Sequence, residues 1–271
     1  MRRALEYVLS SSDGVIAQHA QDPQLAGPGA SPPRGRDNQE ARTSGAGPPL
    51  PRQAWSRETQ IAELYLPRLH ICYVCVRGDR RCHQVGQTTR HHRDRGGCTS
   101  SPHAERPARW SGYDPTYKVN PPLRPDEHVE AVREALADGT IDAVATDHAP
   151  HARHDKEHAF AEAAFGMLGL ETALAVVLET MINSARMNWS ELAKRMSIMP
   201  AHIARLADQD VPWFPVNRPI SYSRRSCRPA RSSTATLRPL LSRNNPWHGR
   251  ELPDPVVATI WAGQITYQKQ L

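Results

Sequence analysis

A carboxylate and two histidines close together form the strongest chemical signal in the chain. The run Thr146-Asp147-His148-Ala149-Pro150-His151 directly follows an apolar stretch, 141–146, that is typical of a buried strand. Barrel enzymes of the α/β class keep their catalytic side chains at the carboxyl ends of their strands. Asp147 could there bind a metal or carry a proton, with His151 four residues further on. The same spacing fits a helix-capping aspartate beside surface histidines, so both interpretations stay open.

A second group of possible metal ligands lies upstream. Cys72 and Cys75 have the Cys-x-x-Cys spacing of a zinc site, and later residues could complete a set of four ligands. The candidates are Cys72, Cys75, Cys82, Cys98, His83, His91, His92 and His103. The later half contains neither a second Cys-x-x-Cys nor a paired-histidine helix, and few apolar residues surround it. An ordered zinc site is the less favoured interpretation of this group.

Apolar periodicity predicts the elements that must position these side chains. Helical spacing covers 126–136 and ends at Asp138-Gly139, and a strand follows at 141–146. Two more helices are expected at 165–181 and 189–196, the second capped by Asn188 or Ser190. Upstream, the pattern predicts the end of a helix at 3–8 and strands at 14–20 and 69–74; downstream, it predicts a hairpin formed by 256–261 and 265–267. This alternation of strands and helices indicates a parallel α/β architecture.

Composition and charge narrow the classes of function. The formal net charge is +6 and the pI about 9.3, which could suit nucleic-acid binding. However, only four basic residues are lysines, aromatic residues make up 6%, and arginine occurs together with proline, serine and glycine. We therefore predict no nucleic-acid partner. No stretch approaches the ~20 apolar residues of a membrane span, and the first residues lack a signal-peptide core. A cytoplasmic protein without a membrane partner is expected, with its cysteines as free thiols or metal ligands rather than disulfides.

Three segments lack any hydrophobic period and are expected to be irregular. They are 31–60, 75–110 and 211–241, each rich in arginine, proline, serine and glycine and devoid of lysine. Disordered linkers have such compositions, although three of them within one compact domain would be unusual. A GC-rich coding sequence translated out of frame would also look like this. The second explanation covers all three segments at once, and it is our hypothesis.

Four motifs together resemble bacterial dihydroorotases, in particular those of actinobacteria. They occur in the family's order and spacing at Lys118–Arg124, Asp138–Asp142, Thr146–His151 and Phe165–Thr172. The resemblance continues in 2–30 and 242–271 and fails in the segments between. It implies a (β/α)8 barrel of the amidohydrolase superfamily with two zinc ions. The implied reaction is the reversible hydrolysis of L-dihydroorotate to N-carbamoyl-L-aspartate in pyrimidine biosynthesis.

The resemblance also implies roles for individual residues. Asp147 matches the catalytic carboxylate, which moves a proton between water and the leaving nitrogen and also touches zinc. His19 matches a metal ligand on an earlier strand. Zinc in such a site acts as a Lewis acid and holds the attacking hydroxide. Four positions match groups that hold the substrate: Asn120, His151, and the backbone at Phe165 and Gly166.

Several of the family's metal ligands have no counterpart in this chain. The first-strand His-x-His pair, its neighbouring arginine and the bridging carboxylate are missing, and Asp13 is not placed to replace that carboxylate. Tyr73 stands where the family has a histidine ligand, and phenolate is a poor substitute for imidazole at zinc. Only His19 and Asp147 remain, which is too few for a dinuclear site. We therefore expect little or no activity.

These observations predict a truncated and partly mistranslated member of the family. The expected fold is an incomplete (β/α)8 barrel over 1–208, an irregular segment over 209–241 and a small β element over 242–271. The expected partner is a small-molecule substrate, dihydroorotate or carbamoyl aspartate. The alternative is a non-catalytic dihydroorotase-like subunit that binds a partner enzyme such as aspartate transcarbamoylase, or a second copy of itself.

Overall fold

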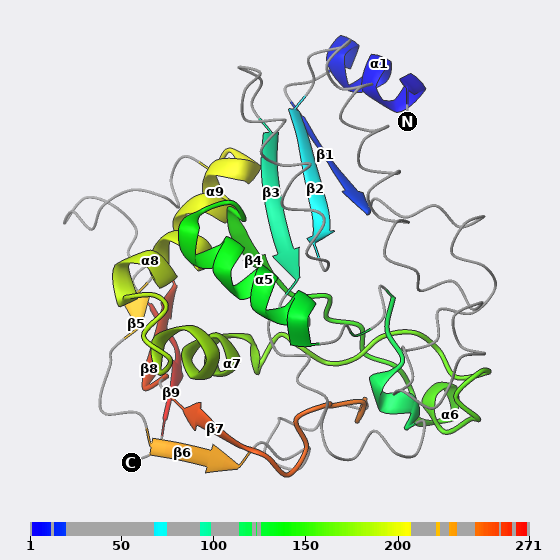
Figure 1. The fold of residues 1–271 in the computed structure, drawn as a ribbon, viewed down its shortest axis with the longest axis vertical. Coiled ribbons are helices and arrows are strands. Elements are labelled where there is room, and N and C mark those ends of the chain that lie inside the picture. The colour runs from blue at the N-terminus through cyan, green and yellow to red at the C-terminus, as the bar shows by residue number, and fades with distance from the viewer. Residues whose placement is uncertain are drawn as a thin grey trace.

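The computed structural model describes a little over half of the chain, including the whole of 126–206. The described residues are 2–11, 14–19, 68–74, 93–98, 114–120, 123, 126–206, 221–222, 228–231, 242–254, 256–261 and 264–269. Figure 1 shows helix α1 (Arg2–Ser11) at one end of the molecule and the C-terminal strands at the other. None of the helices in these ranges is long and apolar enough to cross a membrane.

A parallel sheet carries the candidate site. Its strands run in the order β1 (Val15–His19), β2 (Arg68–Val74), β3 (Arg93–Cys98) and β4 (Ala143–Ala145). All neighbouring pairs are parallel, with His19 opposite Cys72 and Cys98 opposite Ala145. The strands predicted at 14–20, 69–74 and 141–146 are thus confirmed, each within a few residues. Because the strands are parallel, their carboxyl ends lie along one edge of the sheet.

Strand β3 forms where irregular structure was expected. Residues 93–98 lie inside the segment 75–110, and their Arg-Asp-Arg-Gly-Gly-Cys sequence has no strand propensity. They nevertheless connect β2 to β4. A ladder is made by backbone groups, so the two flanking strands can supply hydrogen bonds that local propensity does not predict. The expectation of irregular structure is wrong for these six residues. Segment 31–60 lies outside the described part of the chain.

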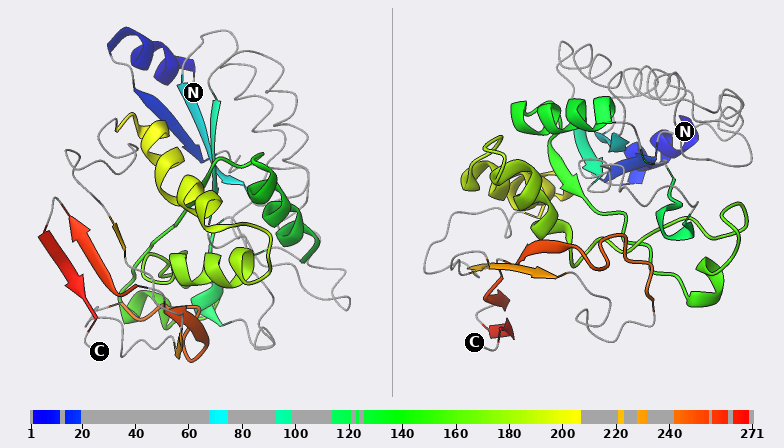
Figure 2. Two further views of the ribbon diagram at one scale, coloured as in Figure 1. Left: turned by 90° about the vertical axis from the view of Figure 1, so that its left-hand side faces the viewer. Right: turned by 60° about the horizontal axis from the view of Figure 1, so that its bottom comes forward.

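Helix α5 (Asp126–Asp138) covers the sheet with one buried face. Acidic residues occupy its first turn, where their negative charge interacts favourably with the helix dipole. Gly139 follows its end with φ of +86°. Its Val132 and Leu136 join a core with the β2 side chains Leu69, Ile71 and Val74. Figure 2 shows the helices α7 to α9 beside α5, and buried side chains of α7 and α8 belong to the same core. The helix predicted from 126 and its stop at Asp138-Gly139 are confirmed.

The long helix predicted at 165–181 begins later than expected. Helix α7 spans Ala173–Val177 and continues as a π-helical turn, η4 (Leu178–Ile182). Residues 165–172 instead form an extended loop, in which Met167 makes a parallel bridge with His148. Gly166 has φ of +133°, a conformation that a helix cannot contain. The helix starts late because of tertiary contacts. The Met167 carbonyl oxygen accepts a hydrogen bond from the Ala149 amide instead of from an amide one helical turn further along the chain.

The next helix begins where its sequence predicts. Helix α8 (Trp189–Ala193) starts with a capping box: Asn188 accepts from the backbone of Glu191, whose side chain accepts from the backbone of Asn188. Such a box satisfies two amide groups that the first turn leaves unpaired. The helix continues through the π-helical turn η5 (Lys194–Ile198) into α9 (Met199–Ala204). Two shorter helices, η3 (Pro115–Tyr117) and α6 (Arg153–Lys156), lie near the candidate site.

The C-terminal strands form two small antiparallel sheets. Strands β8 (Ala258–Trp261) and β9 (Gln264–Gln268) confirm the predicted hairpin, and β5 (Ser221–Tyr222) pairs with β8. Strand β6 (Arg228–Arg231) pairs with β7 (Glu251–Asp254). Strands β5 and β6 lie inside 209–241, so the expectation of irregular structure is wrong at these residues. Both strands pair with strands from 242–271, so their extended structure depends on partners distant in sequence.

Candidate functional site

Two of the predicted site residues follow the ends of parallel strands. His19 is the last residue of β1, and Asp147 lies two residues beyond β4. Burial lowers the pKa of His19, and the negative charge of Asp147 acts in the opposite direction. The histidine and the carboxylate therefore interact electrostatically, each near the carboxyl end of a parallel strand. These are the two residues that the resemblance assigns to metal binding.

The described residues do not assemble a fuller metal site. In those ranges, no three histidine, cysteine, aspartate or glutamate side chains come together as a possible metal site. A dinuclear zinc centre needs more donors than His19 and Asp147. Tyr73 lies in β2, but the structure does not describe its side chain. Of the eight cysteines and histidines considered as zinc ligands in 72–103, six lie outside the described residues. Of the other two, Cys72 is a half-buried cysteine within β2, and Cys98 is the last residue of β3.

His148 has a structural role beside Asp147. Its Nδ1 accepts hydrogen bonds from the backbone amides of Gly169 at 3.3 Å and Leu170 at 3.1 Å. The adjacent Ala149 amide donates to the Met167 carbonyl oxygen at 3.0 Å. These bonds fasten the loop after β4 to the 167–170 segment. The loop that carries Asp147 and His151 is consequently held by a segment some twenty residues further along the chain.

Three of the predicted substrate-binding residues, His151, Phe165 and Gly166, lie next to one another. The Nε2 atom of His151 is 2.7 Å from the carbonyl oxygen of Phe165. The Gly166 amide donates to the Lys118 carbonyl oxygen at 2.9 Å, which brings the segment containing Asn120 alongside. The Oδ1 atom of Asn120 is buried and accepts no hydrogen bond from the described residues. Buried amide oxygens usually have a hydrogen-bond partner, so this atom is an exception among the described residues.

Gly166 is required by the packing against His151. A Cβ atom at this position would lie 2.5 Å from the Ala149 Cβ and 2.9 Å from the His151 Nε2. Both distances are shorter than carbon atoms tolerate, and φ of +133° already excludes most side chains. The close approach of these two backbones depends on the missing side chain. It places the Phe165–Gly166 peptide directly against the His151 ring.

Asn244 and Lys156 contact the same residues, and sequence reasoning missed both. Asn244 accepts from the His151 amide at 3.3 Å and donates to the Ala149 carbonyl oxygen at 2.8 Å. Lys156 donates to the carbonyl oxygen of Gly166 at 2.9 Å. The Asn-Asn-Pro sequence at 244–246 was a visible turn signal. The local sequence around Lys156 did not indicate a buried side chain, and lysines are usually exposed.

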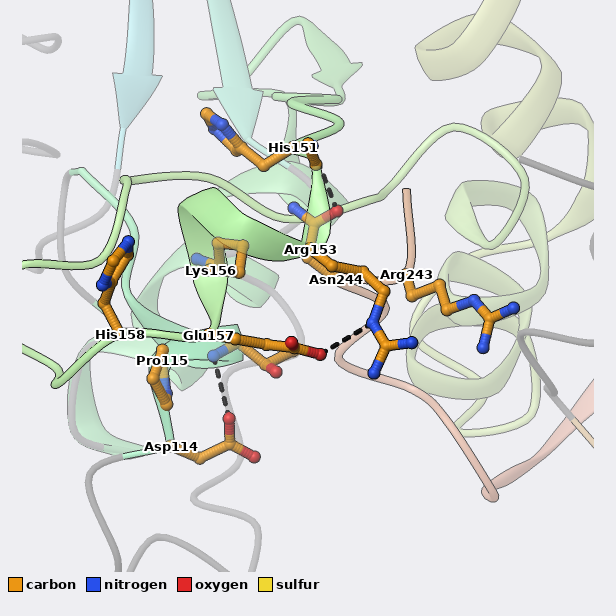
Figure 3. A pocket seen from close by; sticks show the side chains of 11 residues that line it. Asp114, Pro115, His151, Arg153, Lys156, Glu157, His158, Arg243 and Asn244 are labelled. Carbon is orange, nitrogen blue, oxygen red and sulfur yellow. Dashed lines mark hydrogen bonds and ion pairs between the residues drawn. The ribbon is translucent and has the colours of Figure 1, made fainter. Parts of the chain in front are cut away.

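A pocket of about 320 Å³ opens beside His151. Figure 3 shows its lining, in which Arg153 pairs with Glu157 and His151 meets Asn244. Charged groups of both signs surround it, with Arg153 and Arg243 opposed by Asp114 and Glu157. Its size and polarity suit a small polar molecule.

Comparison with known proteins relates the chain to one family of enzymes. No protein-family model matches it. It is 40% identical over 280 residues to the dihydroorotase of Streptomyces coelicolor, covering 98% of this chain and 61% of that protein. The Mycobacterium tuberculosis dihydroorotase is 39% identical over 279 residues, with 98% and 61% covered. The Leifsonia xyli dihydroorotase is 41% identical over 221 residues, with 78% and 48% covered.

Solved structures agree on the fold. The L-hydantoinase (dihydropyrimidinase) of Arthrobacter aurescens matches with a TM-score of 0.83 at 19% identity, over 99% of this chain and 60% of that one. A D-hydantoinase from a Thermus species matches with a TM-score of 0.77 at 15% identity, over 98% and 59%. At these identities the likeness shows a shared α/β fold. The chain is a homologue of bacterial, mostly actinobacterial, dihydroorotases and spans about three fifths of their length.

Proposed function

We propose that the chain retains part of a dihydroorotase substrate site on an incomplete (β/α)8 barrel and catalyses little or no turnover. The observation that carries this proposal is the cluster of Asn120, His151 and the Phe165–Gly166 peptide. A hydrogen bond joins His151 to the Phe165 carbonyl oxygen, and the Gly166 amide bonds to Lys118, two residues before Asn120. His151 also lines a small polar pocket. Imidazole and amide groups can bind the carboxylate and the ring amides of dihydroorotate or carbamoyl aspartate.

The metal-binding side of the site supports the second half of the proposal. His19 and Asp147 interact electrostatically, but within the described residues no third donor joins them, and a pair of zinc ions needs more. Asp147 can still hold or accept a proton at its carboxylate. Without a polarised carbonyl or an activated water, that proton transfer alone accelerates hydrolysis only modestly. We expect turnover at the background rate.

Separate assays of binding and turnover test the two halves. Calorimetric titration with L-dihydroorotate should show weak binding that is lost in His151→Ala and kept in His154→Ala, a matched change at an exposed histidine. The chain supplied with zinc and carbamoyl aspartate should form no dihydroorotate above background, and Tyr73→His alone should not change this. Turnover that depends on zinc and disappears with a chelator would overturn the catalytic half. Absence of any binding would overturn the other half.

A second candidate function is a non-catalytic subunit. The exposed apolar side chains Trp261, Ile265 and Tyr267 of β8 and β9 favour it, because such side chains often mark a protein contact. Sedimentation with and without aspartate transcarbamoylase would separate a mixed complex from self-association. A monomer under both conditions would exclude this candidate.

We also propose that parts of 31–60, 75–110 and 211–241 are translated out of frame. Their shared composition supports this origin. The nucleotide sequence provides the test. If shifting the reading frame in these segments yields no residues resembling the relatives, the proposal is wrong.

A further inference from the structure

One carbonyl oxygen in the site receives two side-chain donors. The Gly166 oxygen accepts from Lys156 Nζ at 2.9 Å and from Asn244 Nδ2 at 3.2 Å. A carbonyl oxygen has two lone pairs, so both bonds can form at once. Lys156 also donates to the Ala164 oxygen at 2.9 Å. A single ammonium group therefore holds the two peptide groups, 164–165 and 166–167, that flank the Phe165–Gly166 peptide.

Asn244 connects this peptide to the loop after β4. Its amide nitrogen also donates to the Ala149 oxygen, and its amide oxygen accepts from the His151 backbone. Its own carbonyl oxygen accepts from Leu168 at 3.0 Å. Its side chain is buried, as is that of Lys156. In Figure 3, Lys156 comes from α6 and Asn244 from the separate C-terminal segment.

We propose that Lys156 and Asn244 are positioning residues, a clamp that fixes the Phe165–Gly166 peptide against the His151 ring for a small carboxylate ligand. The ligand part of this inference rests on the proposed function; the clamp itself rests on the hydrogen bonds. Neither residue needs to touch the ligand. Each acts through the backbone groups that it holds. Loss of either should loosen the 165–168 segment and its contact with the loop after β4, without unfolding α5 or α8.

The charge of Lys156 makes the clamp sensitive to pH. Its described hydrogen-bond acceptors are uncharged carbonyl oxygens, and burial lowers its pKa to about 8, assisted by Lys118 and opposed by Asp114. The other charged or titratable groups that line the pocket with it are His151, Arg153, Glu157, His158 and Arg243. Lysine in an opened loop would regain a pKa near 10.5 and bind its proton more tightly. Opening is therefore favoured at neutral pH and suppressed as pH rises from about 8 towards 10.5.

Hydrogen exchange of the full chain, followed at single amides, tests the clamp. Lys156→Met and Asn244→Leu should each accelerate exchange of the Gly166 and Leu168 amides at least about tenfold, as expected for a lost buried hydrogen bond. The amides of α5 and α8 should not change. Lys194→Met, at an exposed lysine, is the matched control. In the unmodified chain, the opening equilibrium of the loop should fall by more than about tenfold between pH 7 and pH 9.5, and Lys156→Met should abolish that dependence.

The outcomes separate the clamp from the proposed function. Unchanged exchange at Gly166 and Leu168 in both variants would overturn the clamp. So would a pH dependence that persists in Lys156→Met, because Lys118 would then be its source. If a variant fails to fold, the pH series on the unmodified chain still decides: a flat profile overturns the clamp.

A loosened loop in a chain that never binds L-dihydroorotate would support the clamp and refute the proposed function. Equal L-dihydroorotate affinity in a loosened variant and the unmodified chain would refute the ligand role.

Discussion

Replacing Gly166 with alanine should destabilise the chain far more than the same change at Gly249. At Gly166 the added Cβ would lie 2.5 Å from the Ala149 Cβ and 2.9 Å from the His151 Nε2. Overpacking of this kind costs roughly 1–3 kcal/mol. The backbone conformation at φ of +133° adds about 1–3 kcal/mol for any residue with a Cβ. The reduced entropy of the unfolded chain returns about 0.4–1 kcal/mol, which leaves a net loss of roughly 2–5 kcal/mol.

Gly249 provides the matched control. It also has a positive φ, +76°, but its added Cβ would meet nothing within 4 Å. Only the conformational cost applies there, on the order of 1 kcal/mol. Urea denaturation of both variants, monitored by circular dichroism, measures the difference in the free energy of unfolding. Equal losses at the two positions would refute the close approach of the Gly166 backbone to the His151 loop. A larger loss at Gly166 should be accompanied by faster exchange of the Leu168 amide.

Three further changes probe the fold and its charges. Asn188→Ala removes the capping box of α8 and should lower the free energy of unfolding by ~1 kcal/mol; a thermal melt unchanged from that of the unmodified chain would contradict the cap. Met181→Ala, at a fully buried position, should lower it by about 2–5 kcal/mol in urea, and a loss under 1 kcal/mol would show that the core there is loose. Because burial lowers the pKa of Lys156 to about 8, the unfolded chain binds that proton more tightly between about pH 8 and 10.5. Denaturation across this window should show Lys156 contributing a rise in stability on the order of 2 kcal/mol, absent in Lys156→Met.

Local sequence patterns were sufficient for much of the sheet and its helices. The apolar stretches around β1, β2 and β4 and the spacing of Val132 and Leu136 in α5 each report burial directly. The stop at Gly139 follows from its positive φ, which glycine adopts without strain. The motif at 146–151 likewise predicted that Asp147 would follow a strand. In each case the signal lies within a few residues of the element that it predicts.

The sequence by itself thus determined the α/β pattern, the candidate residues and the relationship to dihydroorotases. Only the tertiary structure decided that 165–172 leaves the helix, that β3 completes the sheet, and that Lys156 and Asn244 meet at one carbonyl oxygen. Asn244 lies 78 residues from Gly166 along the chain. A lysine or asparagine is polar wherever it occurs, and whether it is buried depends on acceptors from distant segments. Those acceptors are backbone oxygens, which every residue carries, so no residue type in the sequence distinguishes them.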